Sequence, residues 1–291
     1  MRIVVLGATG MLGQAVSKGA RAAALEVVEV SRSSGVMWDY FANDFGSLAR
    51  EVALEGADVL VNCIGWIPQK ASGSRVLDEQ EANALNIELI REIQASQDDF
   101  GFGWIQIVTD CVFSGKIGNY DENSTFDPFD LYGITKAKGE SLMPGAMRIR
   151  SSIIGPDSIH NSGLFEWFRK QSPNSQLKGF TNHLWNGVST KAFGRLVAGV
   201  SKDEGVRPGI QHWIPQDSMS KYMLLKTFKD ALEREDISID KFETANSLNR
   251  VLATSNHQAN SKLWAIAGYN RIPSIEDLVL EFIHEDLKEG Q

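Results

Sequence analysis

The sequence predicts an α/β protein with a doubly wound parallel sheet and a smaller mixed α/β region beside it. In the first half of the chain, short runs rich in β-branched residues alternate with longer amphipathic stretches of helical period. The strand-like runs are apolar throughout instead of alternating apolar with polar residues. Such runs are typical of parallel strands that helices cover on both faces.

The expected elements follow this alternation in chain order. The apolar runs that predict strands lie at 3–6, 27–30, 59–61, 105–108 and 147–149. Helical patterns lie between them, at 11–24 and 85–95, and two more follow in the second half, at 218–235 and 274–284. Aromatic residues cluster in the second half, where the alternation weakens, so we expect a smaller mixed region there.

Composition excludes several classes of protein. The 291 residues include 29 Lys and Arg against 37 Asp and Glu, a formal charge of -8, which disfavours nucleic-acid binding. The two cysteines, Cys63 and Cys111, form neither a disulfide framework nor a metal-spaced cluster, and no metal site is expected. No apolar run approaches a membrane span and no signal peptide is apparent, so the expected location is the cytoplasm.

A glycine-rich segment joins the first expected strand to the first helix. It consists of Gly7, Ala8, Thr9, Gly10, Met11, Leu12 and Gly13. Glycines at this spacing allow a tight turn and close approach of a pyrophosphate to the helix N-terminus, where free N–H groups favour an anion. Such glycines also serve turns alone, but their place between strand and helix predicts dinucleotide binding.

The end of the second expected strand bears on the choice of cofactor. An Asp or Glu there would bind the adenosine ribose hydroxyls and repel a 2′-phosphate, whereas this chain has Ser31 and Arg32. The pattern favours NADP(H) over NAD(H), the alternative being a solvated loop with one arginine. Asp39 is a candidate acceptor for the adenine amino group, or a turn residue.

Three residues form a candidate catalytic group. Tyr132 and Lys136 are four residues apart, which places them on one face of a helix. A phenol has a pKa of about 10, and a neighbouring ammonium lowers it towards a useful range for proton exchange. Thr109 supplies a hydroxyl at the end of the fourth main strand. A Tyr-x-x-x-Lys pair alone is usually just solvated, but together with Thr109 and the glycine-rich segment it becomes a strong signal.

These motifs resemble those of extended short-chain dehydrogenases/reductases, in particular the dTDP-4-dehydrorhamnose reductase family. The matching segments are 7–13, 62–65, 109–115, 131–140, 148–152, 162–168 and 179–187. The resemblance implies a Rossmann fold in which Tyr132 donates a proton to the carbonyl oxygen. It also implies that Lys136 holds the nicotinamide ribose and tunes Tyr132, and that Thr109 hydrogen-bonds the same substrate oxygen.

The resemblance also assigns residues around the nicotinamide. Cys63, Ile64 and Gly65, after the third main strand, would line that side of the cofactor. Asn86 matches the family's structural and relay asparagine, with Asn83 as a rival for the position.

The residue at the position of Cys111 differs between enzymes of the superfamily that catalyse different reactions. Nucleotide-sugar dehydratases have Glu at this place, rhamnose-pathway reductases commonly have Tyr, and GDP-fucose synthases, which epimerise before reducing, have Cys. One hypothesis is therefore that Cys111 is an epimerisation base with a histidine as acid. The histidine of the fucose synthases aligns with Gly163, and His160 and His183 lie near it in sequence. A small side chain packed near the substrate is the favoured interpretation.

Candidate substrate contacts lie in the second half of the chain. Trp185, beside Asn182 and Asn186, and Arg250 are candidates for contacts to the base and the diphosphate of a nucleotide sugar. Each of them is as readily explained by core packing or an ordinary surface position.

The resemblance implies NAD(P)H-dependent reduction of a keto group on a nucleotide-linked deoxysugar. We expect residues 1–155 to form the dinucleotide-binding domain, with part of 181–205, and 156–291 to be mainly substrate-binding. An epimerase or epimerase-reductase is one alternative, and a non-catalytic NADP-binding regulatory subunit is another. A homodimer is a further expectation from the resemblance.

Overall fold

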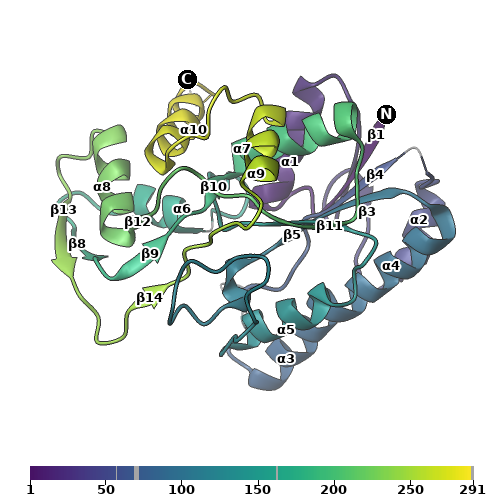
Figure 1. Ribbon diagram of the computed structural model, residues 1–291, viewed down its shortest axis with the longest axis horizontal. Coiled ribbons are helices and arrows are strands. Elements are labelled where there is room, and N and C mark those ends of the chain that lie inside the picture. Colours follow the sequence, from purple (N-terminus) through teal and green to yellow (C-terminus); the bar gives the residue numbers. More distant parts are fainter. Residues whose placement is uncertain (57, 69–71, 162, 290–291) are drawn as a thin grey trace.

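A seven-stranded parallel sheet forms the centre of the fold (Figure 1). Its strands are β1 (Arg2–Leu6), β2 (Glu26–Ser31), β3 (Val36–Met37), β4 (Val59–Asn62), β5 (Gly103–Val108), β6 (Met147–Arg150) and β11 (Gly209–His212). The strand order is β11-β6-β5-β4-β1-β2-β3. The chain moves outward from β1 to β3 and then returns to β4 on the other side of β1, which makes the β1–β4 border the topological switch point.

The computed structural model describes residues 1–56, 58–68, 72–161 and 163–289. Ser162, the first residue of one segment with family resemblance, lies outside them. Each of the five runs predicted as strands falls within a strand of this sheet, so the α/β fold class is confirmed. None of the helices in the described ranges is long and apolar enough to cross a membrane.

Helices cover both faces of the sheet. They are α1 (Met11–Ala22), α2 (Phe45–Glu51), α3 (Arg75–Asn83), α4 (Leu89–Phe100), α5 (Leu131–Glu140), α7 (Thr190–Gly199) and α9 (His257–Ile266). Ile3 and Val5 of β1 pack in one core with α1, α7 and α9, whereas Val4 and Leu6 pack in another with α2 and α4. Figure 1 shows α1, α7 and α9 on one side of the sheet and α2, α4 and α5 on the other. Burial on both faces explains the continuous apolar strands.

A second region lies beside the sheet, around α6 (Gly163–Arg169), α8 (Lys221–Ala231) and α10 (Ile275–Glu289) (Figure 1). Its short strands pair as β12-β9-β14, β10-β7 and β13-β8. They are β7 (Ile153–Ile154), β8 (Gln176–Phe180), β9 (His183–Trp185), β10 (Val188–Ser189), β12 (Met219–Ser220), β13 (Ser238–Phe242) and β14 (Leu248–Asn249). The region has its own core, in which Phe165 packs edge-on against Phe228 and Phe282.

Two expected helices differ in detail from the observed ones. The pattern at 218–235 forms β12 and then α8, because Ser220 caps the helix by accepting a hydrogen bond from the Met223 N–H at 3.2 Å. The pattern at 85–95 begins within a π-helical turn, η2 (Ala84–Glu88), before α4. Such turns are frequently found at functional sites.

The division into domains stays a prediction. The central sheet takes β11, and its helical cover takes α7 and α9, from the half of the chain expected to be mainly substrate-binding. The two regions are therefore interleaved in sequence.

Candidate active site

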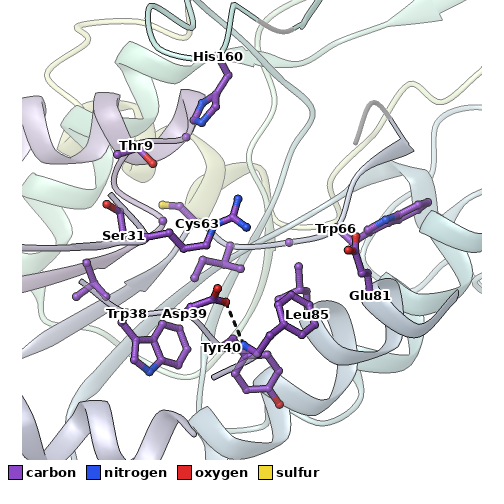
Figure 2. Close-up of a pocket in the computed structure, with 17 residues that line it drawn as sticks. Thr9, Ser31, Trp38, Asp39, Tyr40, Cys63, Trp66, Glu81, Leu85 and His160 are labelled. Atoms are coloured by element: carbon purple, nitrogen blue, oxygen red, sulfur yellow. Dashed lines mark hydrogen bonds between the residues drawn. The ribbon is translucent and has the colours of Figure 1, made fainter. Parts of the chain in front are cut away.

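Two adjoining cavities open at the carboxyl ends of the central strands. The first lies at the switch point and is lined by residues after β1, β2 and β4, among them Gly7, Thr9, Gly10, Ser31, Arg32, Asp39, Cys63, Ile64 and Gly65 (Figure 2). The second has a volume of about 530 Å³ and is lined by Gly10, Met11, Leu12, Cys63, Ile64, Gly65, Thr109, Cys111, Tyr132, Lys136, Trp185 and Arg250, among others. The loop at 63–65 lines both cavities, so they adjoin at this loop.

The glycine-rich segment forms the wall of the first cavity. Gly10 precedes α1 without a side chain to cap the first-turn N–H groups, which leaves them available to a ligand. A Cβ at Gly13 would lie 2.2 Å from the Gly7 carbonyl oxygen, so only glycine allows the helix to pack against the loop this closely. Ala8 is buried beneath the loop. These features fit a bound dinucleotide pyrophosphate.

The end of β2 forms the far side of the first cavity. The Ser31 hydroxyl oxygen accepts hydrogen bonds from the N–H groups of Ser33 and Ser34, at 3.2 and 2.9 Å, and so fixes the turn. Arg32 is exposed and lines the cavity. Asp39 accepts a hydrogen bond from the Phe41 N–H at 3.1 Å, the dashed line in Figure 2, so one of its carboxylate oxygens is used in a turn.

The helix that carries Tyr132 and Lys136 is held in place at both ends. Asp130 caps α5 by accepting a hydrogen bond from the Gly133 N–H at 2.7 Å. A Cβ at Gly133 would lie 2.3 Å from the Cys111 carbonyl oxygen, and one at Gly139 would lie 1.9 Å from the Asn86 carbonyl oxygen. The helix therefore packs directly on the backbone of its neighbours, and it presents Tyr132 and Lys136 to the cavity that Thr109 also lines.

The electrostatics of this group differ from the sequence expectation. Burial raises the pKa of Tyr132 above its ordinary value, and a hydrogen bond with Thr109 opposes the shift. Burial also lowers the pKa of Lys136, against the attraction of Glu140. The expected lowering of the phenol pKa by Lys136 is thus not met in this structure, because loss of water around the phenol dominates.

The two asparagines that compete for the place of the family's structural asparagine differ in burial: Asn86 is buried and Asn83 is exposed. The Asn86 amide accepts a hydrogen bond from the Trp66 N–H at 3.1 Å and donates one to the Thr135 hydroxyl at 3.0 Å. It therefore ties the 63–66 loop to α5. Asn86 lies outside the lining of both cavities and contacts their walls from behind.

Cys111 is the middle residue of a short 3₁₀ turn, η3 (Asp110–Val112), that follows Thr109. Burial, reinforced by Asp110, raises the pKa of the Cys111 thiol to about 12. Its sulfur accepts a hydrogen bond from Arg250 Nη1 at 3.2 Å. His160 lines the same cavity, whereas the His183 Nε2 lies 3.0 Å from the Thr244 hydroxyl, outside the lining residues.

Of the candidate substrate contacts, two line the second cavity and two bind backbone groups instead. Trp185 and Arg250 line the second cavity. Trp185 is 6% exposed and donates its indole N–H to the Ser152 hydroxyl at 2.7 Å. Asn182 is not brought to either cavity, and its amide binds the backbone of Thr244 instead. Asn186 also binds backbone, that of Leu252.

Sequence reasoning missed several charged residues of the second cavity, among them Asp110 and Lys221. Asp110 accepts a hydrogen bond from the Thr109 hydroxyl at 3.2 Å, and its place next to Thr109 in the chain was a usable signal. Lys221 also lines the cavity, with its Nζ 5.0 Å from the centre of the Trp185 ring. Nothing local marks Lys221, since a lysine at the start of a helix is ordinarily solvated.

The parallel sheet, the glycine-rich segment at its switch point and the Tyr-x-x-x-Lys helix define a short-chain dehydrogenase/reductase of the extended type. The family model described as "RmlD substrate binding domain" matches residues 1–262, and the chain belongs to this family.

The family likeness extends to solved structures. The dTDP-4-dehydrorhamnose reductase of Bacillus anthracis, in complex with NADP, has a TM-score of 0.78 at 16% identity, over 98% of this chain and 99% of that chain. The UDP-glucuronic acid 4-epimerase of Bacillus cereus has a TM-score of 0.76 at 17% identity, over 100% of both chains. At these identities the likeness shows the fold.

Among curated proteins, the chain is similar to "Methionine adenosyltransferase 2 subunit beta" of two vertebrates. The Danio rerio protein is 25% identical over 263 residues, 79% of this chain and 73% of that protein. The Xenopus tropicalis protein is 23% identical over 243 residues, 79% of this chain and 72% of that protein.

Proposed function

We propose that this chain reduces a keto group of a nucleotide-linked deoxysugar with a nicotinamide cofactor. One observation carries the proposal: Thr109, Tyr132 and Lys136 line a single cavity that continues past the 63–65 loop to the glycine-rich segment. Family membership and the likeness to dTDP-4-dehydrorhamnose reductases support it.

The first cavity would hold the dinucleotide. The glycine-rich segment would hold the pyrophosphate, Arg32 a 2′-phosphate, and Lys136 with the 63–65 loop the nicotinamide end. The bound cofactor would supply the hydride. We propose NADP(H) over NAD(H), because Ser31 and Arg32 stand where a carboxylate would repel the 2′-phosphate.

The chain's own residues would handle the proton. With its pKa raised by burial, Tyr132 keeps its proton at neutral pH and can donate it to the carbonyl oxygen. The Thr109 hydroxyl, which lines the same cavity, would hold the same oxygen and stabilise charge there. Trp185 and Arg250 would contact the rest of the substrate.

A non-catalytic, NADP-binding regulatory subunit is the second candidate. It is favoured by the similarity to the methionine adenosyltransferase beta subunits. Retention of Thr109, Tyr132 and Lys136 around one cavity favours the reductase, because cofactor binding alone does not require all three.

Epimerisation with Cys111 as base receives less support. With its pKa raised to about 12, the Cys111 thiol stays protonated at neutral pH, and Arg250 donates to its sulfur. A cytoplasmic location, expected from the sequence, and a homodimer, expected from the family resemblance, complete the proposal.

The proposal is tested with purified protein, NADPH and a panel of dTDP-, UDP- and GDP-4-keto-6-deoxysugars, following absorbance at the nicotinamide band. We expect NADPH oxidation with one member of the panel and a loss of at least ~1000-fold in Tyr132→Phe, because the proton donor is gone. Tight NADPH binding without oxidation by any sugar would instead support the regulatory subunit.

A further inference from the structure

Lys221 is half-buried, and its side chain lines the second cavity. In the described part of the chain its Nζ makes no hydrogen bond and has no carboxylate oxygen within 4.0 Å. Its Nζ lies over the Trp185 ring, 5.0 Å from the ring centre. Loss of water lowers the pKa of Lys221 to about 8, against the attraction of Asp110.

The nearby carboxylates are already in use. Asp110 Oδ1 accepts from the Thr109 hydroxyl and lies 3.8 Å from the Cys111 sulfur. Asp130 caps α5 through the Gly133 N–H, and its other oxygen lies 3.7 Å from Arg250 Nη2. These acids moderate the positive charge at long range but do not hydrogen-bond Lys221.

Arg250, a second cation of the same cavity, also lacks a strong hydrogen-bond acceptor for one of its N–H groups. Arg250 directs Nη1 at the Cys111 sulfur, 3.2 Å away, and donates Nε to the Phe113 carbonyl oxygen at 3.0 Å. A protonated thiol is a weak acceptor for a guanidinium, and the pKa of Cys111, about 12, keeps it protonated. Two cationic groups thus line the cavity around Cys111, and neither Lys221 Nζ nor Arg250 Nη1 has a strong acceptor among the described residues.

Lys221 and Arg250 line one cavity and keep N–H donors without a strong acceptor, which suits an anionic ligand. We propose that Lys221, with Arg250, binds an anionic group of the substrate, either a phosphate of the nucleotide or a carboxylate of the sugar. The inference rests on the proposed function in that the cavity takes a nucleotide sugar. Trp185 serves as the platform that holds the Lys221 chain, its indole fixed by Ser152. Cys111 is two residues from Thr109, which places this subsite next to the reacting end of the substrate.

The test measures binding by titration calorimetry, without turnover. The probes are UDP-glucuronic acid, UDP-glucose, UDP, dTDP and GDP, each titrated into the NADP-loaded wild type, Lys221→Met and Lys226→Met. Lys226 is an exposed lysine on the same helix, so its replacement controls for a general change in charge. Lys221→Met keeps the length of the side chain and removes a partly desolvated charge that no described residue hydrogen-bonds, so we expect its melting temperature to be no lower than that of the wild type.

We expect Lys221→Met to weaken binding at least ~10-fold, while Lys226→Met binds like the wild type. Loss for UDP-glucuronic acid alone would assign the subsite to a sugar carboxylate, and equal loss for every probe that binds would assign it to phosphate. Unchanged affinities in Lys221→Met, or no binding of any probe at millimolar concentration, would overturn the proposal. Binding that depends on Lys221, together with no NADPH oxidation by any sugar of the panel above, would support this inference and contradict the proposed reductase activity.

Discussion

The two cavities of this protein are built in different ways. The first is built around three loops where strands of the central sheet end, within a few residues of Gly7, Ser31 and Cys63. The second depends on side chains that come together from distant parts of the sequence, such as Arg250 and Cys111, 139 residues apart. The comparison predicts that the first cavity is sensitive to added atoms in its loops, whereas the second is sensitive to loss of remote polar contacts.

Glu122 illustrates such a remote contact. Its carboxylate accepts hydrogen bonds from the Thr254 hydroxyl at 2.7 Å, the Ser255 N–H at 2.8 Å and the His212 N–H at 2.9 Å. These bonds join the loop after η3 and the edge strand β11 to the 249–256 segment, which carries Arg250. Together they lower the pKa of Glu122 to about 2, against the effect of burial.

The largest expected effect is Gly13→Ala, in the first cavity. Its Cβ would lie 2.2 Å from the Gly7 carbonyl oxygen, so the loop or α1 must shift. We expect NADPH affinity to fall at least ~100-fold, measured by fluorescence titration. Gly56→Ala is the control, since its Cβ would meet its nearest neighbour, the Gly101 carbonyl oxygen, at an ordinary 3.7 Å. NADPH binding by Gly13→Ala at the wild-type level would show that the loop is not the pyrophosphate site.

Glu122→Ala is expected to cost about 2 kcal/mol in the free energy of unfolding, because several donors, some of them partly buried, lose a charged acceptor. It should also weaken binding of the nucleotide-sugar probes through the 249–256 segment, while NADPH affinity stays within about two-fold of the wild type. Urea unfolding and the two titrations measure these effects. An equal loss of NADPH affinity would contradict the separation of the two cavities.

Acid should also weaken the contacts that hold the 249–256 segment. Burial, followed by the charge of Arg150, lowers the pKa of His212 to about 4, and its imidazole lies 2.8 Å from the Ala253 carbonyl oxygen through Nδ1. Between pH 6.5 and 4 the unfolded chain therefore binds the proton that the folded chain excludes, so stability falls as the pH falls. We expect a loss of about 2 kcal/mol over this range from His212, seen as a flatter pH dependence of urea unfolding in His212→Gln. Identical slopes for variant and wild type would contradict this assignment.

Sequence reasoning reached the parts of the molecule that are local. The strands, the glycine-rich segment and the Tyr132–Lys136 spacing are each fixed by neighbours within one strand or one helical turn. Lys221 and Glu122 were not predicted, because a lysine or glutamate has the same local sequence signature whether it is solvated or buried against a distant segment. Asn182 shows the converse: its local context resembles a family motif, but its amide binds the backbone of Thr244, two residues after the end of β13.

Asn86→Ala tests a contact that joins the walls of both cavities. The variant loses the bonds to Trp66 and Thr135, so we expect a loss of about 1.5 kcal/mol in unfolding free energy and weaker binding of NADPH. Asn83→Ala is the matched control, because Asn83 is exposed only three residues away. A larger effect from Asn83→Ala would reverse the choice between the two asparagines.

The smallest expected effect is Arg32→Ala. Its guanidinium is exposed at the rim of the first cavity, where water and salt screen its charge, so its contribution to phosphate binding is modest. We expect NADPH affinity to fall about five-fold, or ~1 kcal/mol, while NADH affinity is unchanged. The difference between the cofactors should shrink as salt is raised, because an exposed ion pair weakens with ionic strength. Equal changes for NADPH and NADH would mean that Arg32 only shapes the loop, and that preference for the phosphorylated cofactor has no basis at the end of β2.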